Sequence, residues 1–185
     1  MKGKIIIFFI FFIFFQPLKA DIKKKIISNL EKTDNLTFNF KQKIEQKNED
    51  GICTIEYPKK IYCIYNNLNE KILVSDGNSL VIKNKNINQY YLYSLKKTPL
   101  EFILDKKFLI NKIKNLDGRL INNKYYNFTL INNNYIINIF FDNTNYNLTG
   151  WQTEDVYKNL VITYISNIKI NQKIDKNIFN LPKNY

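Results

Sequence analysis

The chain has 185 residues, 45% of them hydrophobic, and a formal net charge of +12 at pH 7. It contains no histidine, which excludes catalytic triads and metal sites built on imidazole. Two cysteines are too few for the usual structural zinc site, and no glycine-rich phosphate loop follows a predicted strand. Carboxylate chemistry stays formally open at Glu154-Asp155 or Asp105, but these residues lie in predicted turns or helix ends. We therefore expect no enzyme, metal or cofactor.

The positive charge comes almost entirely from lysine, because Arg119 is the only arginine. Bidentate recognition of phosphate and bases favours arginine over lysine, so nucleic acid is not an expected partner. An acidic protein, an anionic membrane or a compositional bias toward lysine and asparagine would each account for the charge. Charge alone does not decide between them.

Residues 1–20 have the pattern of a secretory signal peptide. Lys2 and Lys4 precede an apolar run from Ile5 to Phe15, and a short exit ends at the small residue Ala20. The run is about half the length of roughly 20 residues that a membrane-spanning helix needs. We expect export to the periplasm with cleavage after Ala20, and one soluble domain over residues 21–185. No cysteine near the cleavage site could accept a lipid anchor.

The first predicted elements are an amphipathic helix and a half-buried strand. The helix is expected to be capped by Asp21. Its apolar face consists of Ile22, Ile26, Ile27 and Leu30. Alternation over residues 36–45 then predicts a strand. Its inward face consists of Phe38, Phe40, Gln42 and Ile44.

Several hairpins follow the first strand. Residues 52–57 and 61–65 are predicted strands that turn at Pro58-Lys-Lys60. Cys53 and Cys63 lie equally far from Pro58, so they should face each other and pair in an oxidising compartment. Residues 71–82 form a second hairpin around Asp76-Gly77, whose glycine readily takes a positive φ. A further strand is expected over residues 89–94.

The pattern then changes from strand to helix and back. Thr98 is expected to cap a helix, with Pro99 at its first position and Glu101 completing a capping box. One or two short apolar helices should follow, up to about Ile110. Five more strands are predicted, at residues 120–121, 125–131, 135–141, 147–152 and 161–168. About ten antiparallel strands with short helices favour an α+β fold, an incomplete and strongly curved β-barrel covered by helices.

These segments, in this order, resemble the LolA family of lipoprotein carriers. The resemblance spans nearly all of the chain beyond residue 20 and looks closest to alphaproteobacterial members. It rests on the following segments: Phe38-Asn-Phe-Lys-Gln42, Tyr57-Pro58, the hairpin with Leu73-Val-Ser-Asp-Gly77, residues 90–100 ending in Thr98-Pro-Leu100, Gly150-Trp-Gln152, and Phe179-x-Leu181. It implies an incomplete barrel with a helical lid, and a monomeric periplasmic carrier without a cofactor. Its expected partners are acylated lipoproteins, a LolCDE-type ABC transporter and a LolB-type acceptor.

The resemblance also suggests which residues hold lipid. The expected cavity residues are Phe38, Phe40, Tyr57, Ile61, Leu100, Phe102 and Ile103. The expected lid residues are Ile22, Ile26, Pro99 and Leu100. Other members often carry arginine where Tyr57 stands, so lid control is expected to differ here. Two other functions stay open from the residues alone, a LolB-like acceptor and a secreted structural or adhesive β-protein.

Overall fold

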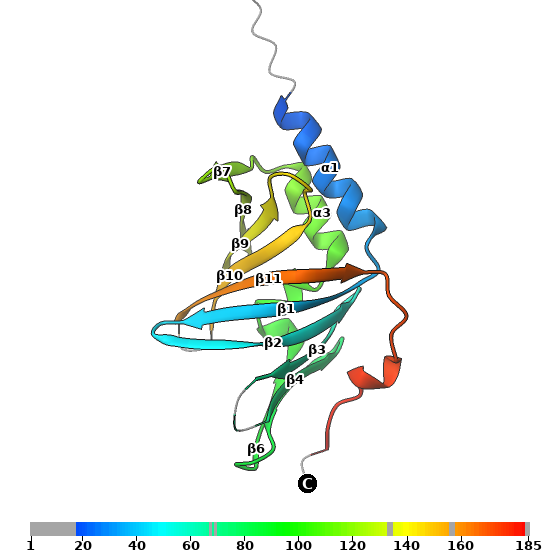
Figure 1. Ribbon diagram of the computed structural model, residues 1–185, viewed down its shortest axis with the longest axis vertical. Helices are drawn as coiled ribbons and strands as arrows, with labels where there is room; N and C mark the ends of the chain where they lie inside the picture. Colours follow the sequence, from blue (N-terminus) through cyan, green and yellow to red (C-terminus); the bar gives the residue numbers. More distant parts are fainter. Residues whose placement is uncertain (1–17, 67, 69, 133–134, 156–157, 184–185) are drawn as a thin grey trace, which may run out of the picture.

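The computed structural model describes residues 18–66, 68, 70–132, 135–155 and 158–183. Eleven antiparallel strands form one sheet in the order β6-β5-β4-β3-β2-β1-β11-β10-β9-β8-β7. The strands are β1 Asn35–Ile44, β2 Lys47–Glu56, β3 Lys60–Tyr65, β4 Lys71–Asp76, β5 Ser79–Asn84, β6 Gln89–Ser94, β7 Arg119–Ile121, β8 Tyr125–Asn132, β9 Tyr135–Asp142, β10 Leu148–Glu154 and β11 Leu160–Ile170. The sheet is open and curled, which confirms the predicted incomplete barrel (Figure 1).

The long strand β1 is the centre of the sheet. It pairs with β2 on one side and β11 on the other. Phe38 and Phe40 point inward and are buried, while Asn39 between them and Lys41 and Lys43 beyond them are exposed. This alternation follows from the two-residue period of a strand with one buried face. The predicted strand was therefore correct in extent and in facing.

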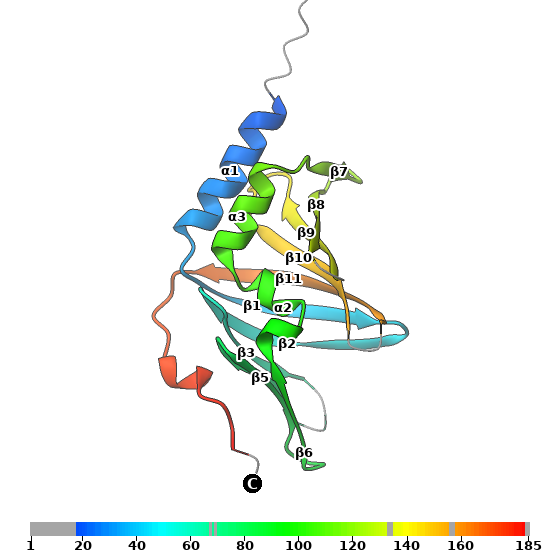
Figure 2. The ribbon, with the colours of Figure 1, turned by 180° about the vertical axis from the view of Figure 1, so that it is seen from behind.

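Three helices cover the concave face of the sheet (Figure 2). They are α1 Leu18–Lys32, α2 Leu100–Ile103 and α3 Lys106–Lys114. Ile22, Ile26 and Leu30 of α1 are buried, as their spacing predicts. The helix begins before Asp21, so this residue is not the cap but pairs with Lys25 at 2.8 Å within the helix. Most of the predicted signal peptide lies outside the described residues.

The helix start at Thr98 was predicted wrongly. A short 3-10 helix, η1 Leu95–Lys97, precedes it, and the buried Thr98 hydroxyl donates to the Leu95 carbonyl at 2.9 Å. Thr98 thus closes η1, and α2 has no side-chain cap. The real cap in this region is Asp105, which accepts a hydrogen bond from the backbone N–H of Phe108 at the start of α3. We call residues 95–105 the lid segment.

The predicted disulfide is present between Cys53 and Cys63. These residues are directly opposed in the β2–β3 pair, and their Cα atoms are 4.1 Å apart. The bond closes the hairpin whose turn contains Pro58 and Lys59. A buried disulfide of this kind fits an exported protein, because thiols in the cytosol are kept reduced.

Removing this bond should weaken the fold. The variant Cys53→Ala/Cys63→Ala is expected to lose about 2–3 kcal/mol of unfolding free energy, because the unfolded chain regains loop entropy. Urea unfolding of the oxidised wild type and the variant measures the difference. Reduced wild type is the matched control and should resemble the variant. A loss below about 0.5 kcal/mol would contradict this view of the hairpin.

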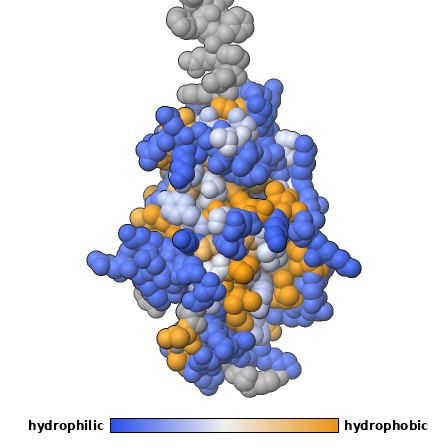
Figure 3. Space-filling model, viewed as in Figure 1, coloured by the Kyte–Doolittle hydropathy of each residue, from blue (hydrophilic) through white to orange (hydrophobic). Residues whose placement is uncertain are grey.

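The outer face of the sheet is partly covered by the C-terminal segment. The 3-10 helix η2 Lys176–Phe179 contacts β3 and β4, where Phe179 is buried and Lys176 pairs with Glu56 at 2.8 Å. Elsewhere on this face, apolar side chains gather among polar ones (Figure 3). They include Ile52 and Ile64, which oppose each other across β2 and β3 and are about half exposed. None of the helices in the described part of the chain has the length and apolarity to span a bilayer.

Candidate functional site

The main cavity lies between the lid segment, β10 and the half of the sheet that contains β1–β6. Its volume is about 500 Å³, within the usual range for small-molecule sites. Its lining comprises Gln42, Ile44, Lys47, Glu49, Tyr65, Lys71, Leu73, Leu80, Ile82, Asn84, Tyr91, Tyr93, Thr98, Pro99, Leu100, Trp151, Thr153, Glu154, Asp155 and Val161. Eight strands, β1–β6, β10 and β11, and the lid segment thus contribute to one space.

One part of this cavity is apolar. Leu73 and Leu80 come from neighbouring strands β4 and β5, Leu100 comes from α2, and Trp151 comes from β10. Trp151 also packs edge-on against Phe38, with ring centroids 6.2 Å apart. Such a surface favours hydrocarbon over water, since burying apolar area is the dominant favourable term in binding of this kind. The arrangement suits an alkyl or acyl chain.

Another part of the cavity wall is charged. The Glu49 carboxylate is 4% exposed and lies 2.7 Å from the Lys71 ammonium and 2.9 Å from that of Lys47. Lys71 lies over the ring of Tyr65, 3.9 Å from its centroid. Burial would raise the pKa of the Glu49 carboxyl, but hydrogen bonds and charge pairing with Lys71 and Lys47 outweigh it and lower that pKa. Burial lowers the pKa of Lys71, opposed by Glu49.

This ion pair should make stability depend on pH. Because the pKa of Glu49 is lowered in the folded protein, its contribution is present above the unfolded value of 4.5 and is lost as pH falls through the folded value. Glu49→Gln is therefore expected to flatten the decline of unfolding free energy below about pH 4.5. Urea unfolding between pH 3 and 7 measures how the unfolding free energy of each protein changes with pH. The control is Glu45→Gln, because Glu45 is exposed. Equal slopes for wild type and Glu49→Gln would contradict the assignment.

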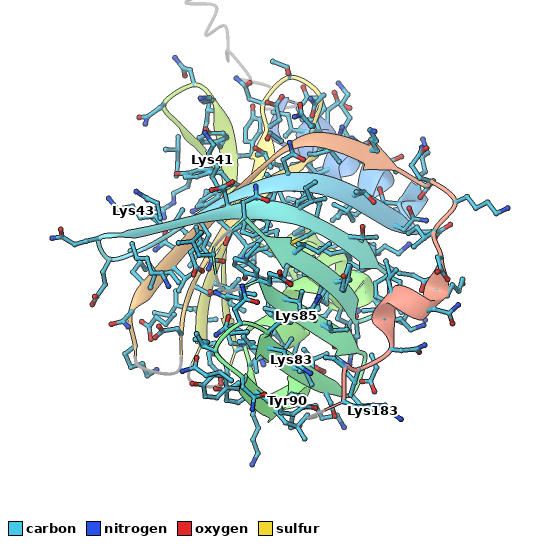
Figure 4. The ribbon with its side chains drawn as sticks, turned by 60° about the horizontal axis from the view of Figure 1, so that its bottom comes forward. Lys41, Lys43, Lys83, Lys85, Tyr90 and Lys183 are labelled. Carbon is cyan, nitrogen blue, oxygen red and sulfur yellow. A yellow bond between two sulfur atoms is a disulfide. The ribbon has the colours of Figure 1, made fainter. Side chains whose placement is uncertain are left out.

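The excess positive charge of the protein lies outside this cavity. Lys41 and Lys43 project from β1, while Lys83, Lys85 and Tyr90 lie near the β5–β6 end of the sheet (Figure 4). The Lys83 ammonium donates to the Lys183 carbonyl at 2.7 Å. Apart from Lys47 and Lys71, the lysines of the described residues do not line the main cavity. Within the described part of the chain, no group of His, Cys, Asp and Glu is arranged to hold a metal ion.

A second, much smaller cavity lies beneath α1. Its volume is about 20 Å³, close to that of one water molecule. Tyr57 lines it together with residues of α1 and of the sheet. The Tyr57 hydroxyl is buried and has no hydrogen-bond partner among the described residues, and burial raises its pKa. The hydroxyl therefore does not latch a helix in this structure.

The structure separates the residues expected at the site into four places. Pro99 and Leu100 line the main cavity. Tyr57 lines the small cavity beneath α1, while Phe102 packs against Phe108 and Tyr135. The remaining expected cavity and lid residues are buried in the core, namely Ile22, Ile26, Phe38, Phe40, Ile61 and Ile103.

Several cavity residues were missed by sequence reasoning. Leu73, Leu80 and Ile82 share the inner face of the predicted β4–β5 hairpin, so its alternation carried a usable signal. Glu49 and Lys71 gave no such signal. They lie on strands separated by β3, and their contact depends on the register of the sheet.

Lys59 attaches the lid segment to the sheet. Its ammonium lies 2.7 Å from a carboxylate oxygen of Glu101 and 3.6 Å from Asp105, and its backbone N–H donates to the Leu104 carbonyl at 2.8 Å. Hydrogen bonding to Glu101 raises the pKa of Lys59. The Ser75 hydroxyl donates to the Lys59 carbonyl and holds the turn from β4. These contacts at the α2 end of the lid segment therefore converge on one lysine. The other end is held by the backbone N–H of Leu95, which donates to the Asn78 carbonyl at 2.8 Å, and by the Tyr135 hydroxyl, which donates to the Lys97 carbonyl at 2.7 Å.

A second lysine joins the two long helices. The Lys106 ammonium donates to the Thr33 carbonyl at 2.7 Å and to that of Glu31 at 3.3 Å, and it pairs with Asp34 at 3.3 Å. These carbonyls lie at the end of α1, where backbone oxygens lack partners within the helix. Lys106 thus fixes α3 to α1, while Lys59 fixes α2 and the start of α3 to the β2–β3 turn.

An open, curled antiparallel sheet with a cavity beneath covering helices defines an α+β half-barrel. The sequence matches the family described as "Outer membrane lipoprotein carrier protein LolA" over residues 31–182. The chain therefore belongs to the LolA family, and this match covers most of its length.

Two solved structures with TM-scores of 0.50 or above share the fold. An uncharacterized conserved protein of Thermus thermophilus superposes with a TM-score of 0.52 at 7% identity, covering 89% of this chain and 94% of that one. A putative outer membrane lipoprotein-sorting protein domain of Vibrio parahaemolyticus gives 0.50 at 9% identity, covering 88% and 96%. A LolA superfamily protein of Nitrosomonas europaea gives 0.45 at 10% identity, covering 88% and 97%. No curated protein matches the sequence.

Proposed function

We propose that this protein is a periplasmic carrier that holds the acyl chains of lipoproteins while they pass from the inner to the outer membrane. The observation that carries the proposal is the main cavity, whose apolar part lies under a lid segment whose α2 end is attached through Lys59. Membership in a family of lipoprotein carriers supports the same cargo. The binding is non-enzymatic, and no bond of the cargo is made or broken.

A carrier must also release what it binds. Each buried methylene contributes about 0.8 kcal/mol, so a long acyl chain in a fixed apolar cavity would be held too tightly for onward transfer. Closure of the lid segment on the same surface opposes this binding, because lid and acyl chain compete for Leu73, Leu80 and Trp151. The net binding free energy is then the difference between burying the acyl chain and burying the lid segment against the same surface, and this difference can be small.

Lys59 is the residue best placed to set that difference. It takes the part that an arginine before the hairpin proline takes in other members, while the hydroxyl of Tyr57 at that position has no hydrogen-bond partner among the described residues. The Lys59 ammonium bonds Glu101 of α2, and entry of lipid would displace α2. Opening the lid segment breaks this contact, and closing restores it. Of the covering helices, α1 stays in place, since its apolar face is buried in the core.

The partners follow from this role. A LolCDE-type transporter would deliver the lipoprotein and a LolB-type acceptor would take it, with a monomer exposing its cavity to each in turn. A LolB-like acceptor function is the second candidate, because the fold is shared, but no cysteine near Ala20 could take a lipid anchor. A structural or adhesive role would leave the cavity and its lid without a use.

Native mass spectrometry tests the proposal. The mature protein is mixed with a detergent-solubilised triacylated lipoprotein, and in parallel with the same lipoprotein stripped of its acyl chains. A one-to-one complex formed only with the acylated form is expected. The absence of a complex with both forms would overturn the proposal.

A further inference from the structure

The buried ion pair of Glu49 and Lys71 is the least expected feature of the main cavity. The two side chains are 4% and 17% exposed, and both line a space that is otherwise largely apolar. They come from β2 and β4 and meet beyond the end of β3, so neither is required for the pairing of adjacent strands. Replacing such a pair by apolar residues of similar size commonly leaves stability unchanged or increases it. Fold stability alone does not account for it.

The pair belongs to a longer polar chain, which we call the polar ledge: Gln42, Glu49, Lys71 and Thr163. The Gln42 amide donates to Glu49 at 3.4 Å, and the Thr163 hydroxyl donates to Gln42 at 3.2 Å. The ledge therefore runs across the wall from β4 to β11. Every side chain in it offers or accepts hydrogen bonds close to the apolar lining.

The ledge lies toward the open end of the cavity. Lys47, which pairs with Glu49, is 69% exposed and lies at the start of β2, next to the β1–β2 turn. Glu154, Asp155 and Val161 line the same cavity from the adjoining ends of β10 and β11. Leu100, which belongs to the lid segment, lines the cavity from α2. An amphiphile that enters here would place its chain beneath α2 and its polar part beside the ledge.

The charges at this end are balanced. Lys47 and Lys71 are present together with Glu49, Glu154 and Asp155, and Glu154 pairs with Lys158 at 3.1 Å. A site for a carboxylate or a phosphate would need an excess of positive charge, and the other lysines lie outside the cavity. Groups that form hydrogen bonds without carrying charge suit this wall better, because they leave the existing pairs intact.

Building on the proposed carrier function, we infer that the polar ledge recognises the uncharged ester and amide groups that join acyl chains to a lipidated cysteine. Ester and amide carbonyls accept hydrogen bonds from the Lys71 and Gln42 side chains, and an amide N–H donates to Glu49. The cavity thus selects the acylated junction as well as the chains. Lipid with an anionic head is a poorer ligand.

The test compares three amphiphiles that share one chain: monopalmitoylglycerol, palmitate and hexadecyltrimethylammonium. Each ligand is titrated into the protein, and its affinity is obtained from the change in fluorescence of Trp151, the only tryptophan, which lines the cavity. Wild type is expected to bind the neutral ester about tenfold more tightly than either charged ligand. In Glu49→Leu/Lys71→Met the preference should fall to about twofold or less, with the fold checked by circular dichroism. Glu70→Leu/Lys85→Met removes an exposed pair at 3.7 Å and should keep the preference.

The outcomes distinguish failure of this inference from failure of the carrier function. Palmitate as the tightest ligand, or an unchanged preference in Glu49→Leu/Lys71→Met, would overturn the inference while leaving the carrier function standing. Failure of wild type to bind any of the three ligands would instead count against the carrier function itself. If the double variant does not fold, Gln42→Leu replaces it, since it keeps the ion pair. It should reduce the preference about threefold, and no reduction would overturn the inference.

Discussion

Ile82→Trp is expected to weaken binding of a triacylated lipoprotein by at least about tenfold. Ile82 lies on β5 and lines the main cavity, where its inward side chain is only partly buried. An indole at this position occupies space that an acyl chain needs, and the half-buried site accepts the larger ring without displacing the core. Isothermal titration or native mass spectrometry with the acylated lipoprotein measures the loss.

The control is the same substitution on the other face of the sheet. Leu92 lies on β6 next to β5, points outward and is 59% exposed. Leu92→Trp adds the same indole to the same part of the fold but leaves the cavity open, so binding should stay within about twofold of wild type. Equal losses for both variants would show that the acyl chains bind elsewhere or that the sheet itself was disturbed.

Lys59→Met is expected to act in the opposite direction and to tighten binding. The substitution keeps the aliphatic part of the side chain but leaves Glu101, which is 14% exposed, without its cation. A buried hydrogen bond to a charged group contributes on the order of 1–3 kcal/mol, so the closed lid is weakened. Loss of about 1 kcal/mol would raise the apparent affinity about fivefold and slow release to the same extent. Stopped-flow release of the lipoprotein to acceptor vesicles measures the rate.

The matched control is Lys107→Met on α3. Lys107 is exposed, and its ammonium forms no hydrogen bond or ion pair within the described part of the chain. The variant has the same change in charge and should release cargo at the wild-type rate. If Lys59→Met also leaves affinity and release unchanged, Lys59 does not control the lid segment.

Sequence patterns were sufficient where one local rule determines the outcome. Phe38 and Phe40 were placed inward by strand alternation, and Cys53 and Cys63 were paired by their equal distance from Pro58. Thr98 was assigned wrongly because a capping box and a closing 3-10 turn share the same residues, and packing of the buried hydroxyl decided between them. The family and the curled sheet, in contrast, followed from the order of many segments.

The cavity was harder to predict, because its residues are brought together only by curvature and register. Phe38 and Ile61 satisfy every sequence criterion for cavity lining, yet both are buried in the core. Glu49 and Lys71 satisfy none of these criteria, yet they form its polar ledge. Whether an inward apolar residue faces packed helix or open space depends on where α1 ends and the lid segment begins, and strand alternation does not encode that boundary.

The location of the acyl chains can be measured directly, because Trp151 lines the main cavity. A lipoprotein with bromine atoms along its acyl chains is added to the mature protein, and the tryptophan fluorescence is followed. Quenching by bromine requires close contact with the indole. If the acyl chains lie in the main cavity, the brominated lipoprotein quenches Trp151 strongly and the unbrominated lipoprotein does not. Mass spectrometry should show that Ile82→Trp prevents the complex. Binding without quenching would place the acyl chains outside the main cavity and contradict the proposed site.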